Sequence, residues 1–596
     1  MENVNVTHYD TKDYIYPLNR NTLQVKIKCE EDTVSSIYIV YWNRFKEDKR
    51  ESKLEHFSLN GTCRFYSTNL IFDESAKYIR YYFIIKNNNS ILYYSPYGIS
   101  TNLPKKYFEY LSTNVNDIFT VPSWAKGAIG YQIFPDRFFN GNVENDPALV
   151  EKWGESPNRE NFFGGDLRGI IEKFSHIKDL GVEIIYLTPI FHSPSNHKYD
   201  TIDYFKVDPS FGDIEDLKEL VRVCTRYDMK LILDGVFNHI GYCSPQFQDV
   251  IHNGKQSPYW DWFYIEDDVV NTDILNYECV GYYKWMPKLN YSNQEVREHF
   301  LRVGEYWIKE VGIDGWRLDV ADEVDFTFWQ EFRKKMKSIE REILLIGETW
   351  KNGSDLIKGD QMDTIMNYRF RDAIIEYFAD RIIQTKSFMD RIENFLFDYP
   401  VMTHNVLYNL LDSHDTARYL TTCNGDLDRF KLSLIFQMTF PGMPFVYYGD
   451  EIGMRGETDP DCRRTMAWDS INGDVLEFYK KIINIRKNSD ALKYGSFKHI
   501  NTNTEVYSFI RQYENESVVV FINNSENDYT LFSELSKAKE NIHVERINEG
   551  NNLESSRSFI VHLPANNFEI ISIVRKEAEL KINRIGREIL NLNLLN

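Results

Sequence analysis

The chain has 596 residues, of which 42% are hydrophobic and 15% aromatic, so it is long enough for roughly three to four domains with large cores. A net charge of −20 argues against nucleic acid and against an anionic membrane surface as partners. There is no apolar run of about 18 residues and no basic-then-apolar leader, which predicts neither a membrane span nor a signal peptide. The seven cysteines are scattered without CxxC spacing, so we expect reduced thiols and a cytoplasmic location.

Residues 1–121 are predicted to form an N-terminal β-sandwich. Short runs of alternating apolar and polar residues recur at Leu23–Cys29, Ser36–Tyr41 and Tyr78–Ile85. Several short strands at such spacing are typical of two packed sheets. The domain has many Tyr and Phe side chains, which fill its core or form an interface, and it shows no catalytic geometry of its own.

From residue 122 to 493 strand-like runs alternate with amphipathic helix-like runs. Eight β-then-α units predict a (β/α)8 TIM barrel. The predicted strands are Gly130–Phe134, Ile184–Pro189, Lys230–Val236, Ile313–Val320, Leu344–Glu348, Asp363–Asn367, Leu407–Asp412 and Pro444–Tyr448. The predicted helices include Glu215–Arg226, Glu295–Val311, Asp325–Ile339 and Asp428–Phe440.

Three further segments complete the predicted architecture. The largest insertion, about residues 240–290, follows the third strand and is rich in Tyr, Trp and Asp, which indicates a subdomain over the barrel mouth. Residues 494–576 again resemble alternating strands and predict a C-terminal β-sandwich. Apolar residues at near-helical spacing predict one amphipathic helix in the tail, residues 577–596.

Polar clusters occur where five of the barrel strands end. In a TIM barrel the active site lies at the carboxyl ends of the strands, so these clusters are predicted to converge. They are His197–Asp200, Asp234–His239, Arg317–Asp319, Glu348–Trp350 and Asp412–Thr416. Each cluster taken alone has a structural alternative, because strand-end Asp residues often cap helices and Asn-His pairs often bond loop backbone.

The stretch Gly315–Val320 is predicted to be a buried strand that presents Arg317 and Asp319 on one face, since strand side chains alternate. A guanidinium beside Asp319 would keep that carboxyl ionised and oriented, as a nucleophile requires. A structural ion pair is the alternative for this pair taken alone.

Together these motifs resemble glycoside hydrolase family 13, the α-amylase family. The first four conserved regions of that family resemble Asp234–His239, Gly315–Asp319, Gly347–Trp350 and Leu411–Asp415. Met286–Asn290 resembles the fifth region of the neopullulanase, cyclomaltodextrinase and maltogenic amylase subfamily. The resemblance extends over residues 1–576 and includes the N-terminal sandwich.

The resemblance implies roles for individual residues. Asp319 would be the nucleophile, Glu348 the general acid/base and Asp415 the stabiliser of the transition state. A retaining glycosidase needs one ionised and one protonated carboxyl; Arg317 favours the ionised form of Asp319, and Trp350 beside Glu348 favours its protonated form. The remaining implied substrate-binding residues are Tyr199, His239, Glu323, His414, Asp459 and Arg463.

The resemblance also implies a structural calcium site in the oxygen-rich loop after the first strand. The implied ligands are Asn140, Asn142, Asn145, Asp146, Gly164 (backbone) and Asp166. Hard oxygen ligands are those that calcium prefers. Asn142 stands where related sequences often have Asp, which removes one charge and is expected to weaken binding. An Asn/Gly-rich turn without metal is the alternative.

The expected function is an α-glucan hydrolase with transglycosylation ability, acting on cyclodextrins, maltooligosaccharides and pullulan. A dedicated glucosyltransferase or an α-1,6-cleaving enzyme on the same scaffold is the main alternative. An inactive amylase-like binding protein, or a glucan-binding module that acts through the N-terminal sandwich, is an alternative from another class. The resemblance further implies a homodimer in which residues 1–121 lie over the barrel mouth of the partner.

Overall fold

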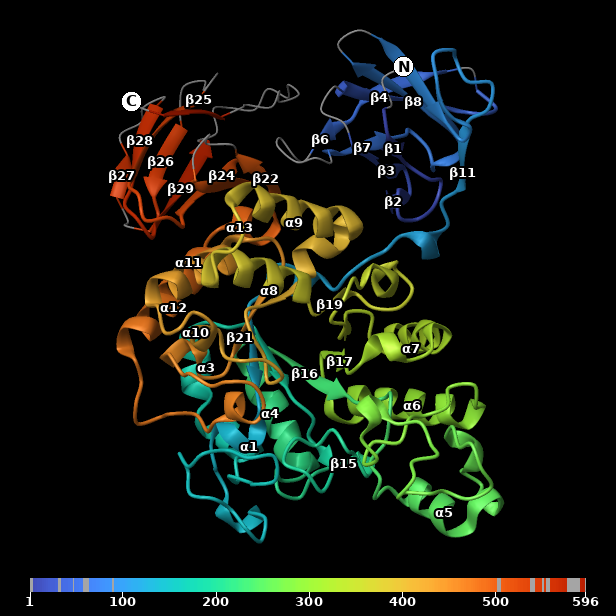
Figure 1. The fold of residues 1–596 in the computed structure, drawn as a ribbon, viewed down its shortest axis with the longest axis vertical. Coiled ribbons are helices and arrows are strands. Elements are labelled where there is room, and N and C mark those ends of the chain that lie inside the picture. Colours follow the sequence, from blue (N-terminus) through green and yellow to red (C-terminus); the bar gives the residue numbers. More distant parts are fainter. Residues whose placement is uncertain are drawn as a thin grey trace.

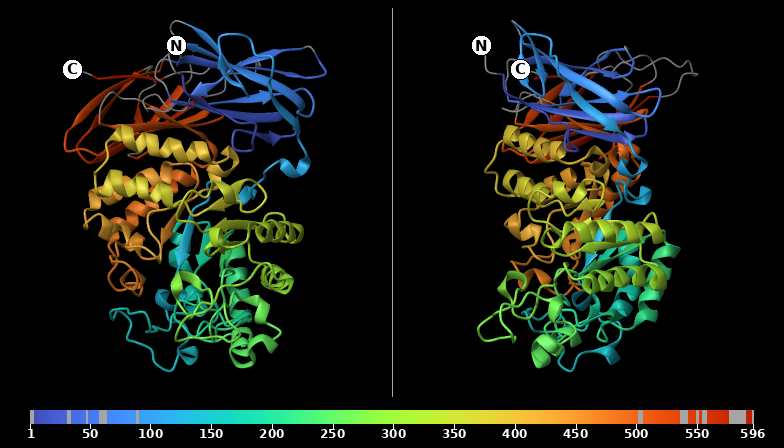
Figure 2. Two further views of the ribbon diagram at one scale, coloured as in Figure 1. Left: turned by 45° about the vertical axis from the view of Figure 1, so that its right-hand side comes forward. Right: turned by 90° about the vertical axis from the view of Figure 1, so that its right-hand side faces the viewer.

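The structure is a computed structural model that describes residues 4–30, 34–46, 48–56, 64–87, 90–500, 505–535, 542–548, 551–553, 558–575 and 590–594. Figure 1 shows two β-sandwich domains, blue and red, at one end of a helix-covered barrel. The views of Figure 2 place both sandwiches at the same end of the barrel and the region around α1 and α5 at the other. The predicted fold class is therefore confirmed.

The N-terminal domain consists of two antiparallel sheets, β1-β3-β7-β6 with β2, and β10-β9-β8-β4-β5 with β11. Residues such as Leu23, Ile39 and Phe83 alternate inward and form the core between the sheets. The strands are β1 (Val6–Thr7), β2 (Ile15–Asn19), β3 (Thr22–Cys29), β4 (Val34–Asn43), β5 (Arg50–Lys53), β6 (Glu55–His56), β7 (Arg64–Ile71), β8 (Lys77–Asn87), β9 (Ile91–Ser95), β10 (Gly98–Ser100) and β11 (Phe108–Ser112).

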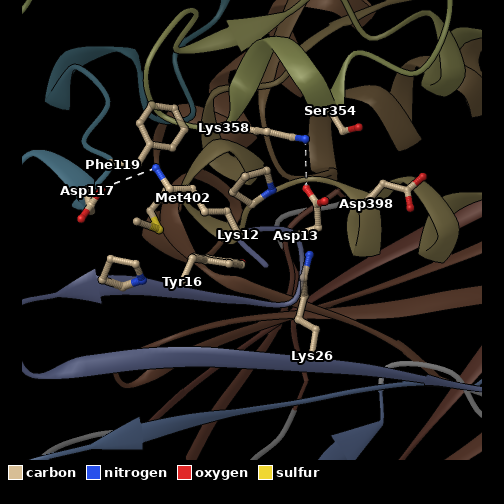
Figure 3. Close-up of a pocket in the computed structure, with 12 residues that line it drawn as sticks. Lys12, Asp13, Tyr16, Lys26, Asp117, Phe119, Ser354, Lys358, Asp398 and Met402 are labelled. Atoms are coloured by element: carbon tan, nitrogen blue, oxygen red, sulfur yellow. Dashed lines mark hydrogen bonds and ion pairs between the residues drawn. The ribbon is translucent and has the colours of Figure 1, made fainter. Parts of the chain in front are cut away.

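This domain packs against the segment that precedes the barrel strand at Tyr408–Leu410, and Figure 3 shows Tyr16 and Lys26 of the domain beside Asp398 and Met402 of that segment. Lys26 of β3 donates a hydrogen bond to the Phe397 carbonyl, and its Nζ lies 4.9 Å from the Phe397 ring centroid. The Tyr16 hydroxyl accepts from the Val401 N–H at 3.0 Å. Burial lowers the pKa of Lys26 to about 8, against the raising effect of nearby carboxylates. Since this contact lies just before a barrel strand begins, the N-terminal domain stands away from the carboxyl ends of the strands in its own chain.

Eight parallel strands form the barrel in the order β19-β18-β17-β16-β13-β12-β21-β20, and a parallel bridge between Met366 and Tyr408 closes it. Each of the eight predicted strands is present, most of them shorter than predicted. They are β12 (Gly130–Ile133), β13 (Ile184–Leu187), β16 (Lys230–Gly235), β17 (Gly315–Leu318), β18 (Leu344–Gly347), β19 (Thr364–Ile365), β20 (Tyr408–Leu410) and β21 (Met443–Tyr447).

Helices surround the barrel, and the predicted amphipathic segments correspond to α4, α6, α7 and α11. The helices are α1 (Pro135–Phe138), α2 (Leu167–Glu172), α3 (Phe174–Leu180), α4 (Ile214–Arg226), α5 (Pro245–Asn253), α6 (Gln294–Tyr306), α7 (Phe326–Ile339), α8 (Tyr368–Ile374), α9 (Thr385–Asp398), α10 (Tyr419–Thr422), α11 (Leu427–Thr439), α12 (Gly473–Lys487) and α13 (Asp490–Tyr494). Among the described residues, no helix is both long and apolar enough to cross a bilayer.

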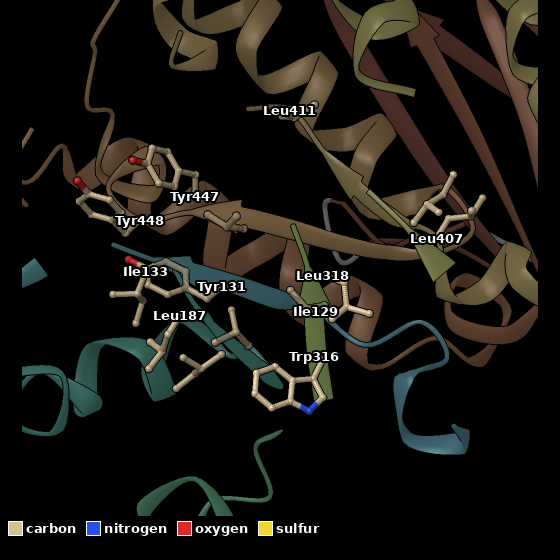
Figure 4. Close-up of a cluster of buried hydrophobic side chains, with 14 of the residues drawn as sticks. Ile129, Tyr131, Ile133, Leu187, Trp316, Leu318, Leu407, Leu411, Tyr447 and Tyr448 are labelled. Carbon is tan, nitrogen blue, oxygen red and sulfur yellow. The ribbon is translucent and has the colours of Figure 1, made fainter. Parts of the chain in front are cut away.

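The pleat of β17 decides which way the site residues point. Trp316 and Leu318 pack in the large core between strands and helices (Figure 4). Their neighbour Arg317 therefore points into the barrel, where its Nε lies 3.5 Å from the Met366 sulfur. The same alternation directs Asp319 inward at the carboxyl end of the strand.

The C-terminal domain also has two sheets, β22-β23-β24-β29-β26-β27 and β28-β25-β30. Its strands are β22 (Ser496–Ile500), β23 (Tyr507–Tyr513), β24 (Glu516–Asn523), β25 (Tyr529–Leu535), β26 (Ile542–Arg546), β27 (Asn551–Leu553), β28 (Ser558–Leu563), β29 (Asn567–Arg575) and β30 (Leu590–Leu594).

The helix predicted for residues 577–596 is wrong where the structure describes that tail. Leu590–Leu594 forms β30, which pairs antiparallel with β25. Leu590, Leu592 and Leu594 fit an i, i+2 pattern, so an apolar spacing that resembled a helix face also fits an edge strand. The rest of this predicted helix lies outside the described residues.

Candidate active site

Arg317 is the centre of the polar cluster at the carboxyl ends of the strands. Its Nη1 donates to Asp319 Oδ1 at 2.7 Å and to Asp234 Oδ1 at 3.0 Å. Its Nη2 lies 2.8 Å from Glu348 Oε2 in an ion-pair contact. Three carboxyl groups from three neighbouring strands, β16, β17 and β18, thus share one buried guanidinium.

The electrostatics of this cluster differ from the prediction that Arg317 alone keeps Asp319 ionised. Burial raises the pKa of Asp319 well above its usual value; Arg317 opposes this rise, and the carboxylates of Glu348 and Asp234 add to it. Burial likewise raises the pKa of Asp234 to about 6. One positive charge facing three carboxyls in a low-dielectric site favours retention of a proton within the group. The raised pKa of Asp319 runs against the ionised form that a nucleophile needs, and Arg317 is the group that opposes this rise.

Glu348 is fixed by neighbours on both of its oxygens. Oε2 accepts from the Val320 N–H at 3.0 Å, and Oε1 accepts from Trp350 Nε1 at 3.3 Å. The indole of Trp350 stacks on the Tyr368 ring, with centroids 4.0 Å apart, and remains 52% exposed. A half-exposed aromatic face beside a buried carboxyl suits the apolar C–H face of a sugar ring.

Asp415 is held by His414 and Arg463. Its Oδ2 lies 3.1 Å from His414 Nε2, and its Oδ1 accepts from Arg463 Nη2 at 3.1 Å. Arg463 also lies 3.0 Å from Asp459, so the two residues predicted to bind the next sugar form one ion pair. Burial, together with the arginines nearby, lowers the pKa of His414 well below its usual value, which makes this imidazole neutral.

Tyr199 and His239 lie beside this group. The Tyr199 ring stacks parallel to His414, with centroids 5.6 Å apart and 5° between planes, and its hydroxyl lies 2.5 Å from His414 Nε2. His239 is buried, and its Nε2 lies 3.1 Å from the Tyr199 carbonyl oxygen. Burial lowers the pKa of His239 to about 4. Both imidazoles are thus neutral, buried polar groups.

Comparison with known proteins agrees with this geometry. The family described as the alpha amylase catalytic domain matches residues 132–473, and the alpha amylase N-terminal ig-like domain matches residues 1–114. The chain belongs to the α-amylase family. It is therefore a glycoside hydrolase.

The relatives are similar along nearly the whole chain. A cyclomaltodextrinase of Thermoanaerobacter pseudethanolicus is 43% identical over 549 residues, which cover 90% of this chain and 95% of the relative. Neopullulanase 2 of Thermoactinomyces vulgaris is 40% identical over 547 residues, with 89% and 93% covered. A solved structure of a cyclomaltodextrinase has a TM-score of 0.89 at 34% identity and covers 95% of this chain and 99% of its own.

Several residues of this α-amylase-family site were not singled out from the sequence. Gln132 Nε2 lies 2.6 Å from His414 Nδ1, and the Tyr186 hydroxyl donates to Asp234 Oδ2 at 2.6 Å. Tyr368 supports the indole of Trp350. These residues stand inside or just after apolar strands and belong to no polar cluster, so the available signal was their inward register at the strand ends.

The predicted acceptor-side residue Glu323 lies at the edge of the site. Its side chain is 47% exposed, and Oε2 lies 3.3 Å from Lys288 Nζ. Lys288 also donates to Asn238 Oδ1 at 2.9 Å, which joins the inserted subdomain to the end of β16. Glu323 is thus the most exposed carboxyl of this group.

The residues of the predicted calcium loop fit a cation. Asp166 Oδ2 accepts from the Asn142 N–H at 2.9 Å, and Asp146 Oδ1 accepts from Asn140 Nδ2 at 2.8 Å. The buried oxygens Asn140 Oδ1 and Asn145 Oδ1 have no hydrogen-bond partner, an arrangement that a hard cation would satisfy.

A glycine brings the backbone close to two of these side chains. Gly164 has φ 76°, and a Cβ there would collide with Asp146 Oδ1 and Asn140 Nδ2. Gly164 therefore packs directly against the side chains of Asp146 and Asn140.

Proposed function

We propose that this enzyme is a retaining α-glucan hydrolase that cleaves α-1,4-glucosidic bonds of cyclodextrins, maltooligosaccharides and pullulan, with transglycosylation ability. The observation that carries the proposal is the convergence of Asp319 and Glu348 on one guanidinium. A retaining mechanism requires two carboxyls that lie close together, about 5–5.5 Å apart. Similarity to a cyclomaltodextrinase and a neopullulanase supports the substrate class.

The catalytic cycle assigns one role to each carboxyl. Asp319 attacks the anomeric carbon while Glu348 gives its proton to the leaving glycosidic oxygen. Glu348 then takes a proton from water, or from a sugar hydroxyl in transglycosylation, as the ester to Asp319 is broken. Asp415 faces the ring from the other side, where its charge favours the cationic transition state.

The substrate would be held by the residues around Asp415. Tyr199 and His414 offer a flat surface and a polar edge to the sugar at the cleavage point. His239 offers a neutral imidazole. The Asp459–Arg463 pair is placed to bind hydroxyls of the next sugar, and Glu323 lies where an acceptor would enter.

Product analysis on β-cyclodextrin, pullulan and starch in parallel tests this function, with proton NMR of the first product. We expect turnover of all three, cyclodextrin fastest, and an initial α-anomer, because two displacements restore the configuration. An initial β-anomer would contradict the mechanism. Cleavage of pullulan at its α-1,6 bonds, with no panose among the products, would favour the α-1,6-cleaving enzyme. Transfer of glucosyl groups without hydrolysis would favour the glucosyltransferase. No turnover of any glucan would favour an inactive binding protein.

We also propose that calcium occupies the loop formed by Asn140, Asn142, Asn145, Asp146, Gly164 and Asp166. Two unpartnered buried oxygens support this site. A bound ion there would stabilise the loop after β12 and take no part in the reaction.

Calcium is expected to raise the Tm of the chelated protein by several degrees. Binding to the folded state alone contributes about 2.7 kcal/mol at a hundredfold excess over Kd. Differential scanning fluorimetry with EDTA and with calcium measures the effect. Asp146→Asn should abolish most of the response, whereas Glu144→Gln, which removes an exposed charge in the same loop, should keep it. An unchanged Tm in the wild-type protein would refute the site.

We further propose a homodimer in which residues 1–121 of one chain cover the barrel mouth of the other. In its own chain this domain contacts Phe397 and Val401 at the amino end of the barrel, away from the site, so it can narrow a cleft only in a partner. Tyr97 and Phe45, which are 81% and 72% exposed, offer aromatic surface for such a contact.

Light scattering is expected to show a dimer for the full-length chain and a monomer after deletion of residues 1–121. Without a domain over the cleft, the rate ratio of cyclodextrin to starch should fall. A short chromogenic maltooligosaccharide serves as the control, since a small substrate does not depend on the width of the cleft. A monomeric full-length protein, or an unchanged ratio after deletion, would exclude this gating role.

We propose a cytoplasmic location as well. Cys224, Cys243, Cys279, Cys423 and Cys462 are free thiols, four of them wholly or partly buried, and a reducing compartment would preserve them.

A further inference from the structure

Val320, the residue that follows Asp319, has a strained backbone. Its φ is 44° and its ψ 46°, in the left-handed region. In the described part of the chain nine non-glycine residues have positive φ, and Val320 is the only β-branched one among them. A β-branched side chain crowds the backbone in this region, so such a conformation persists only where surrounding contacts hold it.

The contacts that hold Val320 lead to Glu348. The Val320 N–H donates to Glu348 Oε2 at 3.0 Å, and the Ala321 N–H donates to the Glu348 carbonyl at 3.0 Å. The Asp319 N–H bonds to β16, so the Val320 N–H faces β18, and the left-handed backbone of Val320 then turns the Ala321 N–H toward the same residue at the end of β18. Two consecutive N–H groups at this turn therefore hold Glu348, one on its carboxyl and one on its backbone carbonyl.

The two oxygens of Glu348 have different surroundings. Oε2 faces the Val320 N–H at 3.0 Å and the positively charged Arg317 Nη2 at 2.8 Å. Oε1 has one contact, Trp350 Nε1 at 3.3 Å, on the side of the exposed indole. A hydroxyl at Oε2 would set its proton against a donor and a cation, whereas one at Oε1 faces no cation and only the more distant, neutral N–H of Trp350.

We propose that Val320 is a positioning residue whose strained backbone N–H, with Arg317, occupies Oε2 of Glu348 and so confines the transferable proton to Oε1. The inference rests on the proposed function, in which Glu348 is the general acid/base. It adds which oxygen of Glu348 transfers the proton and which residue determines that choice.

The proton balance of the cycle follows from this arrangement. In the first step the Oε1 proton passes to the glycosidic oxygen as the bond to the anomeric carbon breaks and the bond to Asp319 forms. Glu348 is then a carboxylate, and the N–H on Oε2 stabilises that charge. In the second step Oε1 takes a proton from water, whose oxygen bonds to the anomeric carbon as the ester to Asp319 breaks.

Replacing Val320 with its α-hydroxy acid tests the proposal, because the resulting ester lacks the N–H but keeps the side chain. Loss of a donor to the carboxylate should favour the protonated form of Glu348. The alkaline limb of the kcat/KM profile on β-cyclodextrin should therefore move up by about one pH unit. Val320→Gly, which keeps the N–H, should leave that limb in place.

The same ester at Val324 is the matched control. Val324 is a valine on the same loop with an ordinary φ of −94° and contributes no contact to Glu348, so its ester should leave the profile unchanged. An unshifted limb in a folded Val320 ester would overturn the proposal, as would an equal shift in the Val324 ester.

Neutron diffraction of the unmodified enzyme at acidic pH provides a second measurement that needs no variant. A deuteron on Glu348 Oε1 supports the proposal, and one on Oε2 overturns it. Failure of the proposed function would look different: Glu348→Gln would then keep its activity whatever the position of the proton.

Discussion

Asp319→Asn and Glu348→Gln are each expected to lower kcat/KM on β-cyclodextrin by roughly a thousandfold or more. Both substitutions keep the size of the side chain and remove one of two groups that act as a unit. Asp319 contacts Arg317 at 2.7 Å and Glu348 contacts it at 2.8 Å, so each loss leaves the other carboxyl in place. Initial rates, with circular dichroism as a check on folding, measure the effect.

An activated substrate separates the two roles. With a glycosyl fluoride the leaving group needs no proton, so Glu348→Gln should form the first product at a substantial rate while Asp319→Asn should not. Asp325→Asn is the control, because it removes a charge nearby and keeps the cap of α7. Near-wild-type turnover of β-cyclodextrin in either variant would refute the assignment.

Arg317→Gln is expected to lower the free energy of unfolding by about 3–5 kcal/mol, since it leaves three buried carboxyls without their shared cation. Arg317 opposes the raised pKa of Asp319 and of Asp234, the latter at about 6. Without it these groups bind protons still more readily when folded than when unfolded. At low pH these carboxyls are protonated and need no cation. The decrease in the free energy of unfolding caused by Arg317→Gln should therefore grow as pH rises from about 5 to 8.

Denaturant unfolding at several pH values measures this trend. Arg297→Gln is the matched control, because Arg297 also pairs with two carboxylates, Asp325 and Glu331, but both partners are about half exposed. The cost of its loss should vary much less with pH, because its carboxylate partners remain solvated and ionised without it. A pH-independent cost for Arg317→Gln would show that the carboxyls do not depend on it.

The features that could be predicted from the sequence follow from the alternation of side chains within single strands, which is a local property. The eight barrel strands and the polar residues at their ends could be predicted because short apolar runs recur and side chains alternate along each strand. The sharing of a face by Arg317 and Asp319 follows from their spacing of two residues. The helix predicted for the tail was wrong because periodicity alone was ambiguous there: its apolar residues fit both a helix and the strand β30.

The sequence by itself determined the barrel, the flanking sandwiches and the strand-end carboxyls, since each depends on periodicity within a short segment. Only the tertiary structure decided that Arg317 serves three carboxyls rather than one, because Asp234, Asp319 and Glu348 lie on different strands. The left-handed turn at Val320 likewise depends on Glu348, which is distant in the sequence, because a β-branched residue has no local preference for a left-handed backbone. Protonation and backbone strain are properties of groups brought together in space, and spacing along a single chain does not contain them.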